Sequence, residues 1–407
     1  MGPTDASTKR ALLFVASWFL FPPSTGGRIR TLQILRGLKG GAFSVTLASP
    51  VTRDGEHRFA AELKRICDRF VGWPTRRRSR WRRFRRLAAL PGQLPVAVAA
   101  DRSVEGRRVV ARELAARPDL LVVDTAHAAA MLPGRVDVPS VLSTHNVEAE
   151  ILLRGAAAAP GSLARLVGRQ QAAKMERYER ETLARFDRVI AVSERDAKLI
   201  REAYGARDVH AVFTGVDLDY FAFAPPSAEP RVVFTGSMDW PPNAGGIAWF
   251  LREVWPAVGL AVPGASFKVV GHNPPSRLVR AARAARVEFT GFVDDVRPHM
   301  RGAAASVIPL LVGSGTRVKA YEAMAQGCPI VSTTVGMEGL PAEPGRHFLV
   351  ADQPADFARA LVRLLRDPAL GARLAADARR FVEAGRSAAR TAAEFERVCL
   401  GALNGAV

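Results

Sequence analysis

The 407-residue sequence contains few cysteines and few aromatic residues, and both shortages narrow the class of protein. Cys67, Cys328 and Cys399 lie far apart, and neither their odd number nor their spacing suits a disulfide framework or a metal site. We therefore expect a reducing, cytoplasmic environment. Aromatic residues make up only 7% of the chain, which favours parallel strands covered by helices over an aromatic-rich β-sandwich.

The sequence also lacks a long apolar run at its N-terminal end. The apolar stretch from Ala11 to Phe21 is too short to cross a bilayer. Pro22 and Pro23 follow it directly, so it has no small-residue cleavage site of the kind that ends a signal peptide. We interpret this stretch as containing a buried first strand.

Acidic residues are scarce relative to basic ones. The chain has 58 Lys and Arg against 39 Asp and Glu, a formal net charge of +19. Such an excess indicates anionic partners, which include nucleic acids, acidic lipids and phosphorylated small molecules. The charge alone does not choose among them.

Short apolar runs alternate with helical stretches along the whole chain, which predicts an α/β fold with two Rossmann-like, doubly wound parallel sheets facing a central cleft. A proline-rich break at 222–230 divides the halves. We expect an N-terminal domain (1–222), a second domain (223–385) and a C-terminal helix (386–407) that packs back toward the first domain. The predicted strands are Ala11–Ala16, Phe43–Ala48, Asp119–Asp124, Ser140–Ser143, Arg188–Val192, Arg231–Thr235, Ser266–Val270, Val287–Phe289, Ala304–Ile308, Pro329–Ser332 and His347–Val350.

A double glycine lies between the first predicted strand and the helix predicted over Arg28–Leu38. Gly26 and Gly27 would let the backbone approach a ligand closely, and amides at a helix start can receive an anion. The segment lacks the spacing of a dinucleotide-binding motif, and it also fits an ordinary strand–helix turn.

The segment Gly313–Glu322 follows a predicted strand and opens a helix, for which Thr316 is the expected N-cap. Its small residues predict an amide-rich nest for anions. Arg317 and Lys319 add the positive charge that a diphosphate leaving group requires. Glu322 lies one turn further on, where a carboxylate can accept the hydroxyls of a ribose. A surface Lys–Glu pair after a glycine turn is the alternative.

With these segments the sequence resembles the retaining family 4 glycosyltransferases of the GT-B fold, especially bacterial exopolysaccharide sugar transferases. The resemblance covers nearly the whole chain, and the order and spacing of its motifs are highly specific. In the first half they are the double-glycine segment, Asp124–His127, Ser143–Glu148 and Asp187–Ser193; in the second half they are Phe234–Asn243, Val270–Pro274, Phe289–Val296, Gly313–Pro329 and Ser332–Leu340.

The resemblance implies a role for each matching position. Arg317 and Lys319 would neutralise the donor diphosphate, Glu322 would bind the ribose, and His127 would contact the transferred sugar. His145 would lie in a second loop at the cleft. The other implied substrate-binding residues are Gly26, Gly27, Asn146, Gly236, Gly291, Phe292, Val293, Gly313, Ser314, Gly315, Thr316, Gly336, Met337 and Glu338. From the residues alone, His127 also fits a capping or packing role, and His145 with Asn146 a hydrogen-bonded loop.

The sequence departs from the family pattern at two places. Ser314 stands where many members carry a second Glu, and Met238–Asn243 replaces an early Arg-Lys, which puts more of the phosphate charge on Arg317 and Lys319. The resemblance implies a front-face displacement in which the departing phosphate helps to deprotonate the acceptor. It also implies no cofactor beyond the nucleotide sugar, and no residue cluster has metal-ligand spacing.

Eight of the eleven residues from Arg76 to Arg86 are arginine. Aromatic residues among arginines are typical of a membrane-surface segment, and they also suit single-stranded nucleic acid or a solvated loop. In this family the region often faces a membrane-bound acceptor, which favours an anionic membrane over nucleic acid. The membrane-surface residues would be Arg76, Arg77, Arg78, Arg80, Trp81, Arg82, Arg83, Phe84, Arg85 and Arg86.

The sequence thus predicts a transferase that moves a sugar from UDP or GDP to a glycan or lipid-linked acceptor, as a cytoplasmic or peripheral membrane protein. Two other functions are compatible with the same fold. A GT-B nucleotide-sugar epimerase would convert the donor without an acceptor. A non-enzymatic binder of anionic polymers would bind nucleic acid in a salt-sensitive way and would ignore nucleotide sugars.

Overall fold

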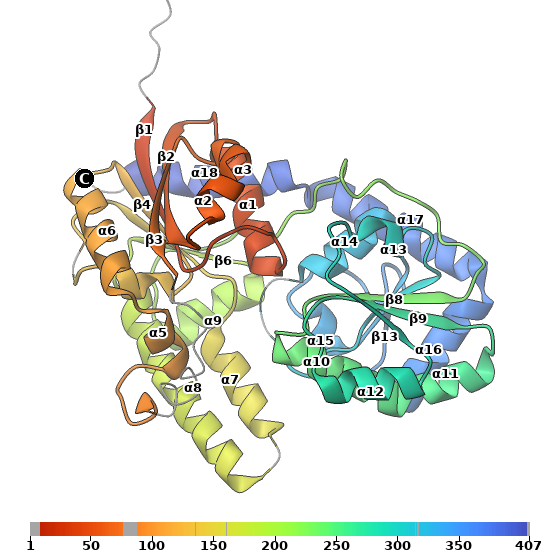
Figure 1. Cartoon of the computed structure of the whole chain (residues 1–407). Helices are drawn as coiled ribbons and strands as arrows, with labels where there is room; N and C mark the ends of the chain where they lie inside the picture. The colour runs from red at the N-terminus through yellow and green to blue at the C-terminus, as the bar shows by residue number, and fades with distance from the viewer. Residues whose placement is uncertain are drawn as a thin grey trace, which may run out of the picture. The chain divides into compact units, whose positions relative to one another are not determined.

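The chain folds into two units, each built on a parallel β-sheet with helices on its faces (Figure 1). The computed structural model describes residues 9–75, 88–134, 136–159, 161–313, 315 and 317–404. The first unit comprises 1–23, 30–213 and 391–407, and the second comprises 24–29 and 214–390.

The described part of the first unit forms a seven-stranded sheet in the order β3-β2-β1-β4-β5-β6-β7, with every neighbouring pair parallel. The chain starts in the middle at β1, moves outward to one side, and then returns to β4 and moves to the other. The strands are β1 (Arg10–Ala16), β2 (Phe43–Val51), β3 (Arg69–Pro74), β4 (Leu120–Asp124), β5 (Ser140–Ser143), β6 (Arg188–Ala191) and β7 (Val209–Ala211).

The central strands of this sheet are apolar on both faces, as parallel strands covered by helices must be. In β4 all five residues are buried, and in β1 burial begins at Leu12. The covering helices are α1 (Gly26–Leu38), α2 (Gly55–Arg58), α3 (Ala60–Lys64), α5 (Val96–Asp101), α6 (Val104–Ala115), the 3₁₀ turn η1 (Ala128–Met131), α7 (Glu148–Ala157), α8 (Ser162–Leu183), α9 (Glu194–Tyr204) and α18 (Ala388–Asn404).

The C-terminal helix α18 completes the core of the first unit. Phe395 and Cys399 are fully buried and share one hydrophobic cluster with Leu12 of β1 and Leu35 of α1. Figure 1 shows α18 beside the strands at the beginning of the chain. The first unit therefore contains residues from both ends of the sequence.

The described part of the second unit forms a six-stranded parallel sheet in the order β10-β9-β8-β11-β12-β13. The strands are β8 (Arg231–Thr235), β9 (Ser266–Val270), β10 (Glu288–Gly291), β11 (Ala305–Ile308), β12 (Ile330–Ser332) and β13 (Leu349–Val350). The helical segments are α10 (Pro241–Trp249), the π-turn η2 (Phe250–Val254), α11 (Trp255–Ala261), α12 (Ser276–Ala284), α13 (Arg297–Met300), α14 (Val318–Gln326), α15 (Thr334–Met337), α16 (Pro354–Arg366) and α17 (Pro368–Gly385).

The α/β fold with two parallel sheets is confirmed, and every predicted strand coincides with an observed strand to within a few residues. The pattern does not predict β3 or β7, which form the two edges of the first sheet. It also places the start of α1 too late, because Gly26 and Gly27 form the first turn of that helix and not a loop before it. None of the helices in the described residues is long and apolar enough to span a membrane.

Replacing Phe395 by alanine should reveal how much α18 contributes to the first unit. Removing a fully buried phenylalanine leaves a cavity and typically lowers the free energy of unfolding by about 3–5 kcal/mol. Chemical denaturation of Phe395→Ala measures this loss. The control is Arg397→Ala on the exposed face of the same helix, which should change the stability by less than about 0.5 kcal/mol. Equal stability of the two variants would contradict the packing of α18.

Candidate functional site

In the second unit, the residues that the sequence analysis singles out follow the carboxyl ends of successive strands. Gly236 follows β8, Gly291 ends β10, Gly313 follows β11 and Gly336 follows β12. The order of strands reverses between β8 and β11, and ligands of open α/β sheets bind at such a switch point, outside the carboxyl ends of the strands. The topology therefore brings these loops to one edge of the sheet.

The turn after β8 is made tight by glycine. Gly236 has a φ of +148°, which favours glycine, and a Cβ at this position would lie 2.8 Å from both Lys319 Nζ and Asn243 Nδ2. Gly271, after β9, packs directly on the Gly236 carbonyl, and a Cβ there would approach the oxygen to 2.0 Å. The two glycines leave room for the side chains of Lys319 and Asn243 against the backbone.

Helix α14 begins at Val318 with Arg317 in the N-cap position, so the predicted N-cap at Thr316 is wrong. The Arg317 side chain is 3% exposed and donates a hydrogen bond from Nη2 to the Val335 carbonyl oxygen, at 2.9 Å. Its guanidinium nitrogens lie close under Gly313, where a Cβ would come within 3.3 Å of Nη2. Arg317 thus holds the loop after β11 against helix α15.

Lys319 lies in the first turn of α14, and its half-buried side chain contacts residues of β8 and α10. Its ammonium donates to Asn243 Oδ1 at 2.7 Å and lies 4.1 Å from the centroid of the Phe234 ring. Burial, with a smaller effect from the nearby Arg317, lowers the pKa of Lys319 to about 7, and Glu322 opposes this only in part. The charged form of Lys319 is therefore less stable here than in water, and a nearby anion would stabilise it.

Glu322 lies one turn after Lys319 on the same helix and is 8% exposed. Burial raises the pKa of Glu322 to about 7, and the Lys319 charge partly opposes the rise. Both groups of the pair titrate near neutral pH, which is unusual for structural surface residues and frequent at functional sites.

The remaining predicted residues of the second unit lie on loops of the same sheet edge. Phe292 is half exposed, and its ring meets His272 edge-on with centroids 6.1 Å apart. Gly336 and Met337 form the end of the short helix α15, where Gly336 N donates to Thr333 Oγ1. Val293 is half-buried in the core, Glu338 is the C-cap of α15, and Gly315 lies just before α14.

In the first unit, a buried carboxylate ties the double-glycine helix to a histidine loop. Asp124 ends β4 and is fully buried. It accepts a hydrogen bond from Thr31 Oγ1 of α1 at 2.7 Å, and its other oxygen lies 2.7 Å from His145 Nε2. Trp18 meets the His145 ring edge-on at 5.9 Å between centroids. His145 is 4% exposed, and Asn146 beside it donates to Glu148, so the hydrogen-bonded loop is what the structure shows at these two positions.

His127 lies at the N-cap of η1 and pairs with a residue that the sequence analysis did not identify. Its Nδ1 is 2.7 Å from Asp101 Oδ2, at the end of α5. Burial opposes protonation of His127, but the hydrogen bond from Asp101 and the negative charge of Glu148 outweigh it and raise the pKa of His127. Because Asp101 occupies Nδ1, Nε2 is the ring nitrogen left for a further partner.

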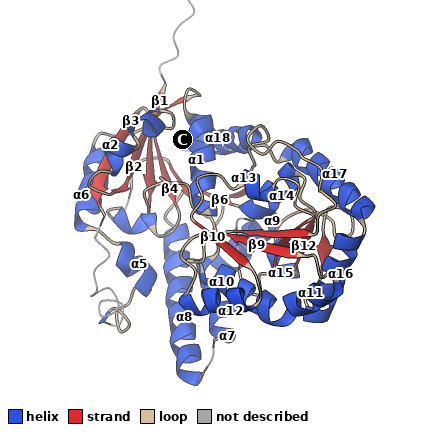
Figure 2. Ribbon diagram, turned by 45° about the vertical axis from the view of Figure 1, so that its right-hand side comes forward, coloured by secondary structure: helices blue, strands red, loops and turns tan. Residues whose placement is uncertain are grey.

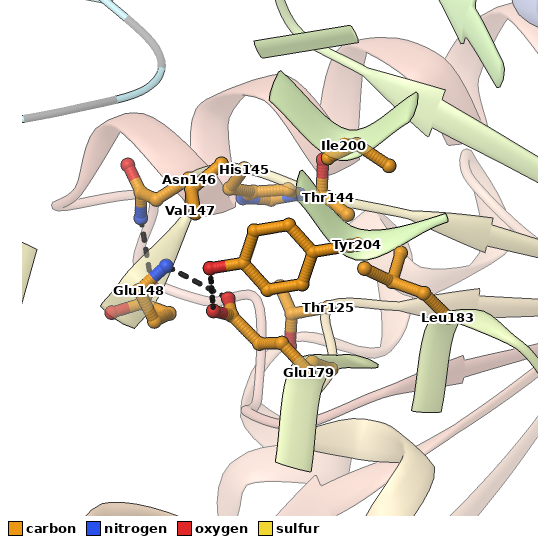
Figure 3. Close-up of a pocket in the computed structure, with 11 residues that line it drawn as sticks. Thr125, Thr144, His145, Asn146, Val147, Glu148, Glu179, Leu183, Ile200 and Tyr204 are labelled. Carbon is orange, nitrogen blue, oxygen red and sulfur yellow. Dashed lines mark hydrogen bonds between the residues drawn. The ribbon is translucent and has the colours of Figure 1, made fainter. Parts of the chain in front are cut away.

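Figure 3 shows a small cavity between these loops and helices α8 and α9. Its volume of about 20 Å³ is enough for a water molecule and too small for a sugar. Glu179 of α8 lines it and accepts hydrogen bonds from the backbone of Glu148 and Ala149, the first residues of α7, and from the Tyr204 hydroxyl. Burial raises the pKa of Glu179 to about 7. The residues around this cavity hold the start of α7 in place, and the cavity is too small to be a sugar-binding pocket.

Several predicted residues lie outside the described residues. They are Ser314, Thr316 and the whole arginine-rich segment Arg76–Arg86. Among the residues that the structure does describe, no group of three or more His, Cys, Asp or Glu is placed to hold a metal ion.

Two models of glycosyltransferase families match successive parts of the chain. The model described as Glycosyltransferase Family 4 matches residues 25–220, and the model described as Glycosyl transferases group 1 matches residues 229–367. A curated relative, an uncharacterized 44.6 kDa protein in the cps region of Klebsiella pneumoniae, is 25% identical over 140 residues. That match covers 32% of this chain and only 36% of the relative.

Solved glycosyltransferase structures share the fold over the full chain. Sucrose-phosphate synthase from Thermosynechococcus elongatus superposes with a TM-score of 0.68 at 18% identity, covering 96% of this chain and 98% of the other. A TarM variant from S. aureus, solved with UDP, gives 0.71 at 10% identity, covering 97% and 100%. HepE from Anabaena, solved with UDP and glucose, gives 0.67 at 15% identity, covering 96% and 100%.

These identities are low, so the solved structures establish the fold and not the substrate. The class of protein is indicated by the two family models, because each of them matches one of the two halves that contain a sheet. The chain therefore carries a Glycosyltransferase Family 4 domain followed by a Glycosyl transferases group 1 domain, and these families together with the fold support a glycosyltransferase of the GT-B type.

Proposed function

We propose that this protein is a retaining glycosyltransferase that moves a sugar from a UDP- or GDP-sugar to a glycan or lipid-linked acceptor in the assembly of cell-surface polysaccharide or glycolipid. The observation that carries the proposal is the half-buried Lys319 ammonium near the buried Arg317 and Glu322 at the start of α14. The two family models, and the UDP bound by HepE and TarM, support a nucleotide-sugar donor.

In this proposal the second unit binds the donor. The amides of the first turn of α14 and the cations of Arg317 and Lys319 bind the diphosphate, whose negative charge grows as the bond to the sugar breaks. Lys319 has a pKa of about 7 in the free protein, and an anion beside it would restore the fully charged ammonium. Glu322 accepts hydrogen bonds from the ribose hydroxyls.

The chemistry follows from where the charge develops. The acceptor hydroxyl attacks the anomeric carbon on the face from which the diphosphate departs, and its proton passes to the leaving phosphate oxygen, so the configuration is retained. The enzyme then needs charge stabilisation and positioning rather than a nucleophile of its own. Cations at the helix start supply the charge that a metal ion supplies in other transferases, and we propose that catalysis is metal-independent.

His127 is the residue of the first unit that we propose contacts the transferred sugar. Asp101 accepts the proton of Nδ1 and so fixes the imidazole with Nε2 available to a hydroxyl of the substrate. Asp101 is then a positioning residue, which acts through His127. Gly26 and Gly27, with their amides in the first turn of α1, are proposed to lie against the donor phosphates or the acceptor.

The acceptor is proposed to be presented at the cytoplasmic face of a membrane. The support is the +19 net charge and the arginine-rich composition of 76–86, which suits anionic lipid headgroups. A lipid-linked acceptor would place the reaction at such a surface.

Replacing Glu322 by alanine should lower kcat/KM by roughly 10- to 100-fold, the usual effect of removing hydrogen bonds to a charged group. Calorimetry with UDP and GDP and their sugars measures the donor affinity, and product analysis measures turnover. The control is Glu343→Ala, an exposed carboxylate of the same unit, which should have no effect. Unchanged donor affinity and turnover in the Glu322 variant would rule out the ribose contact. Conversion of the donor without acceptor would indicate an epimerase.

The donor affinity of the wild type relative to Lys319→Gln should fall as the pH rises above 7, by up to about tenfold per pH unit. The sign follows from Lys319: its pKa is about 7 in the free protein and higher beside a diphosphate, so this group takes up a proton on binding. Glu322 ionises over the same range and is present in both proteins, so the comparison isolates the lysine. Titration of a UDP-sugar between pH 6.5 and 9, in buffers of different ionisation enthalpy, measures both affinity and proton uptake. A ratio of the two affinities that is independent of pH would contradict the role of Lys319.

Replacing Asp101 by asparagine should lower the pKa of His127, because it removes the negative charge that favours the imidazolium. NMR titration of the histidine ring protons measures the pKa directly. The acid limb of the kcat/KM profile should move to lower pH by the same amount if His127 acts with Nε2 free. Asp294→Asn, an exposed aspartate of the second unit, is the control. A lower activity with an unchanged pKa of His127 would mean that Asp101 acts only on stability.

A further inference from the structure

Helices α7 and α8 form an antiparallel hairpin that extends away from the sheet of the first unit, as Figures 1 and 2 both show. The helices touch closely near the turn, where a Cβ on Gly168 would come within 2.7 Å of the Ala156 Cβ. Gly161 is the N-cap residue of α8 and has a φ of +87°, which favours glycine. The two helices of the hairpin are therefore packed against each other close to the turn.

The tip exposes large apolar side chains. Leu163 is 72% exposed, Leu166 is 66% exposed and Leu153 is 55% exposed. Leu163 and Leu166 are three residues apart in α8 and so lie on neighbouring positions of one helical face. Single exposed leucines are ordinary on protein surfaces, but here the two helices of one projecting hairpin expose three leucines near their connection.

The charge of the tip has one sign. From Ile151 to Met175 the sequence has no Asp or Glu, and its ionisable residues are Arg154, Arg165, Arg169 and Lys174. Arg165 and Arg169 are exposed beside the leucines. The acidic partner of Arg154, Glu150, lies at the other end of α7, where it also pairs with Arg195.

We propose that the tip of the α7–α8 hairpin is a membrane-docking element that inserts Leu153, Leu163 and Leu166 into the interface of an anionic bilayer. Arginines at the level of the phosphates and leucines below them match the layers of such an interface. A protein partner is disfavoured because three leucines at a narrow tip are far fewer than the 20–30 residues that each side of a stable interface buries.

The tip and the arginine-rich segment 76–86 are different parts of the sequence, and the action of the tip does not depend on the proposed transferase activity. Vesicle binding and donor binding can therefore fail independently.

The first experiment is flotation of the full chain with vesicles of phosphatidylglycerol and phosphatidylcholine. The triple variant Leu153→Gln, Leu163→Gln, Leu166→Gln should lower the partition coefficient at least about fivefold. The pair Arg165→Gln and Arg169→Gln should lower binding to anionic vesicles only at low salt. Leu260→Gln, a leucine of the second unit that is 85% exposed, is the matched control. Neutralising the arginines of 76–86 in parallel measures the other surface.

The second experiment detects insertion through the polarity around a dye attached to the tip, and this signal does not depend on changing the charge of the protein. Cys67, Cys328 and Cys399 are buried, so an environment-sensitive dye can be attached selectively to Ser162→Cys at the tip. Its emission should shift to the blue with anionic vesicles, while the same dye on Glu181→Cys, exposed at the far end of α8, should not respond.

Unchanged flotation of the leucine variant, or no shift of the dye at 162, would overturn the proposal. Loss of self-association by that variant in sedimentation, without loss of vesicle binding, would assign the tip to a second copy of the chain instead. Calorimetry of each variant with the UDP-sugar keeps the tests separate, since it shows that the second unit still binds its donor.

Discussion

A partly desolvated ammonium group is the constraint on which the proposed donor site of the second unit depends. Lys319 is half-buried, and the partial loss of hydration lowers its pKa to about 7. Its ammonium donates to an amide oxygen of Asn243 and lies over the ring of Phe234, and both of these groups are neutral. The space for it exists because Gly236 has no side chain. In the proposed function a bound diphosphate would stabilise the charged form of this lysine.

In the first unit, by contrast, carboxylates form hydrogen bonds with histidines and with helix ends. Asp124 joins α1 to the His145 loop, Asp101 fixes His127, and Glu179 caps α7 from a neighbouring helix. Each of these contacts orients a loop that follows a strand of the parallel sheet. Paired polar groups therefore position the loops of the first unit, whereas the proposed site of the second unit depends on the charge of Lys319.

Most strands, and the loops that follow them, could be predicted from the sequence. Buried parallel strands appear as continuous apolar runs, and the carboxyl ends of parallel strands share one edge of the sheet. Strand β3 escaped prediction because it is a half-buried edge strand with Gly72 and Pro74 in it, and β7 because it has only three residues. The contacts that hold two of the predicted residues, Lys319 and His127, were not predicted. Lys319 and Asn243 are 76 residues apart, and Asp101 and His127 are 26 apart, so no local pattern connects them.

The position of α18 affects how the chain can fold during synthesis. Phe395 and Cys399 fill the same cluster as Leu12, yet nearly the whole sequence separates them. A ribosome that has delivered the first half of the chain has therefore not delivered everything that the core of the first unit requires. The second unit, whose strands all lie within 231–350, can close around its own sheet earlier. Domains usually mature in the order in which they are translated, but here the unit that begins first is the last to be finished.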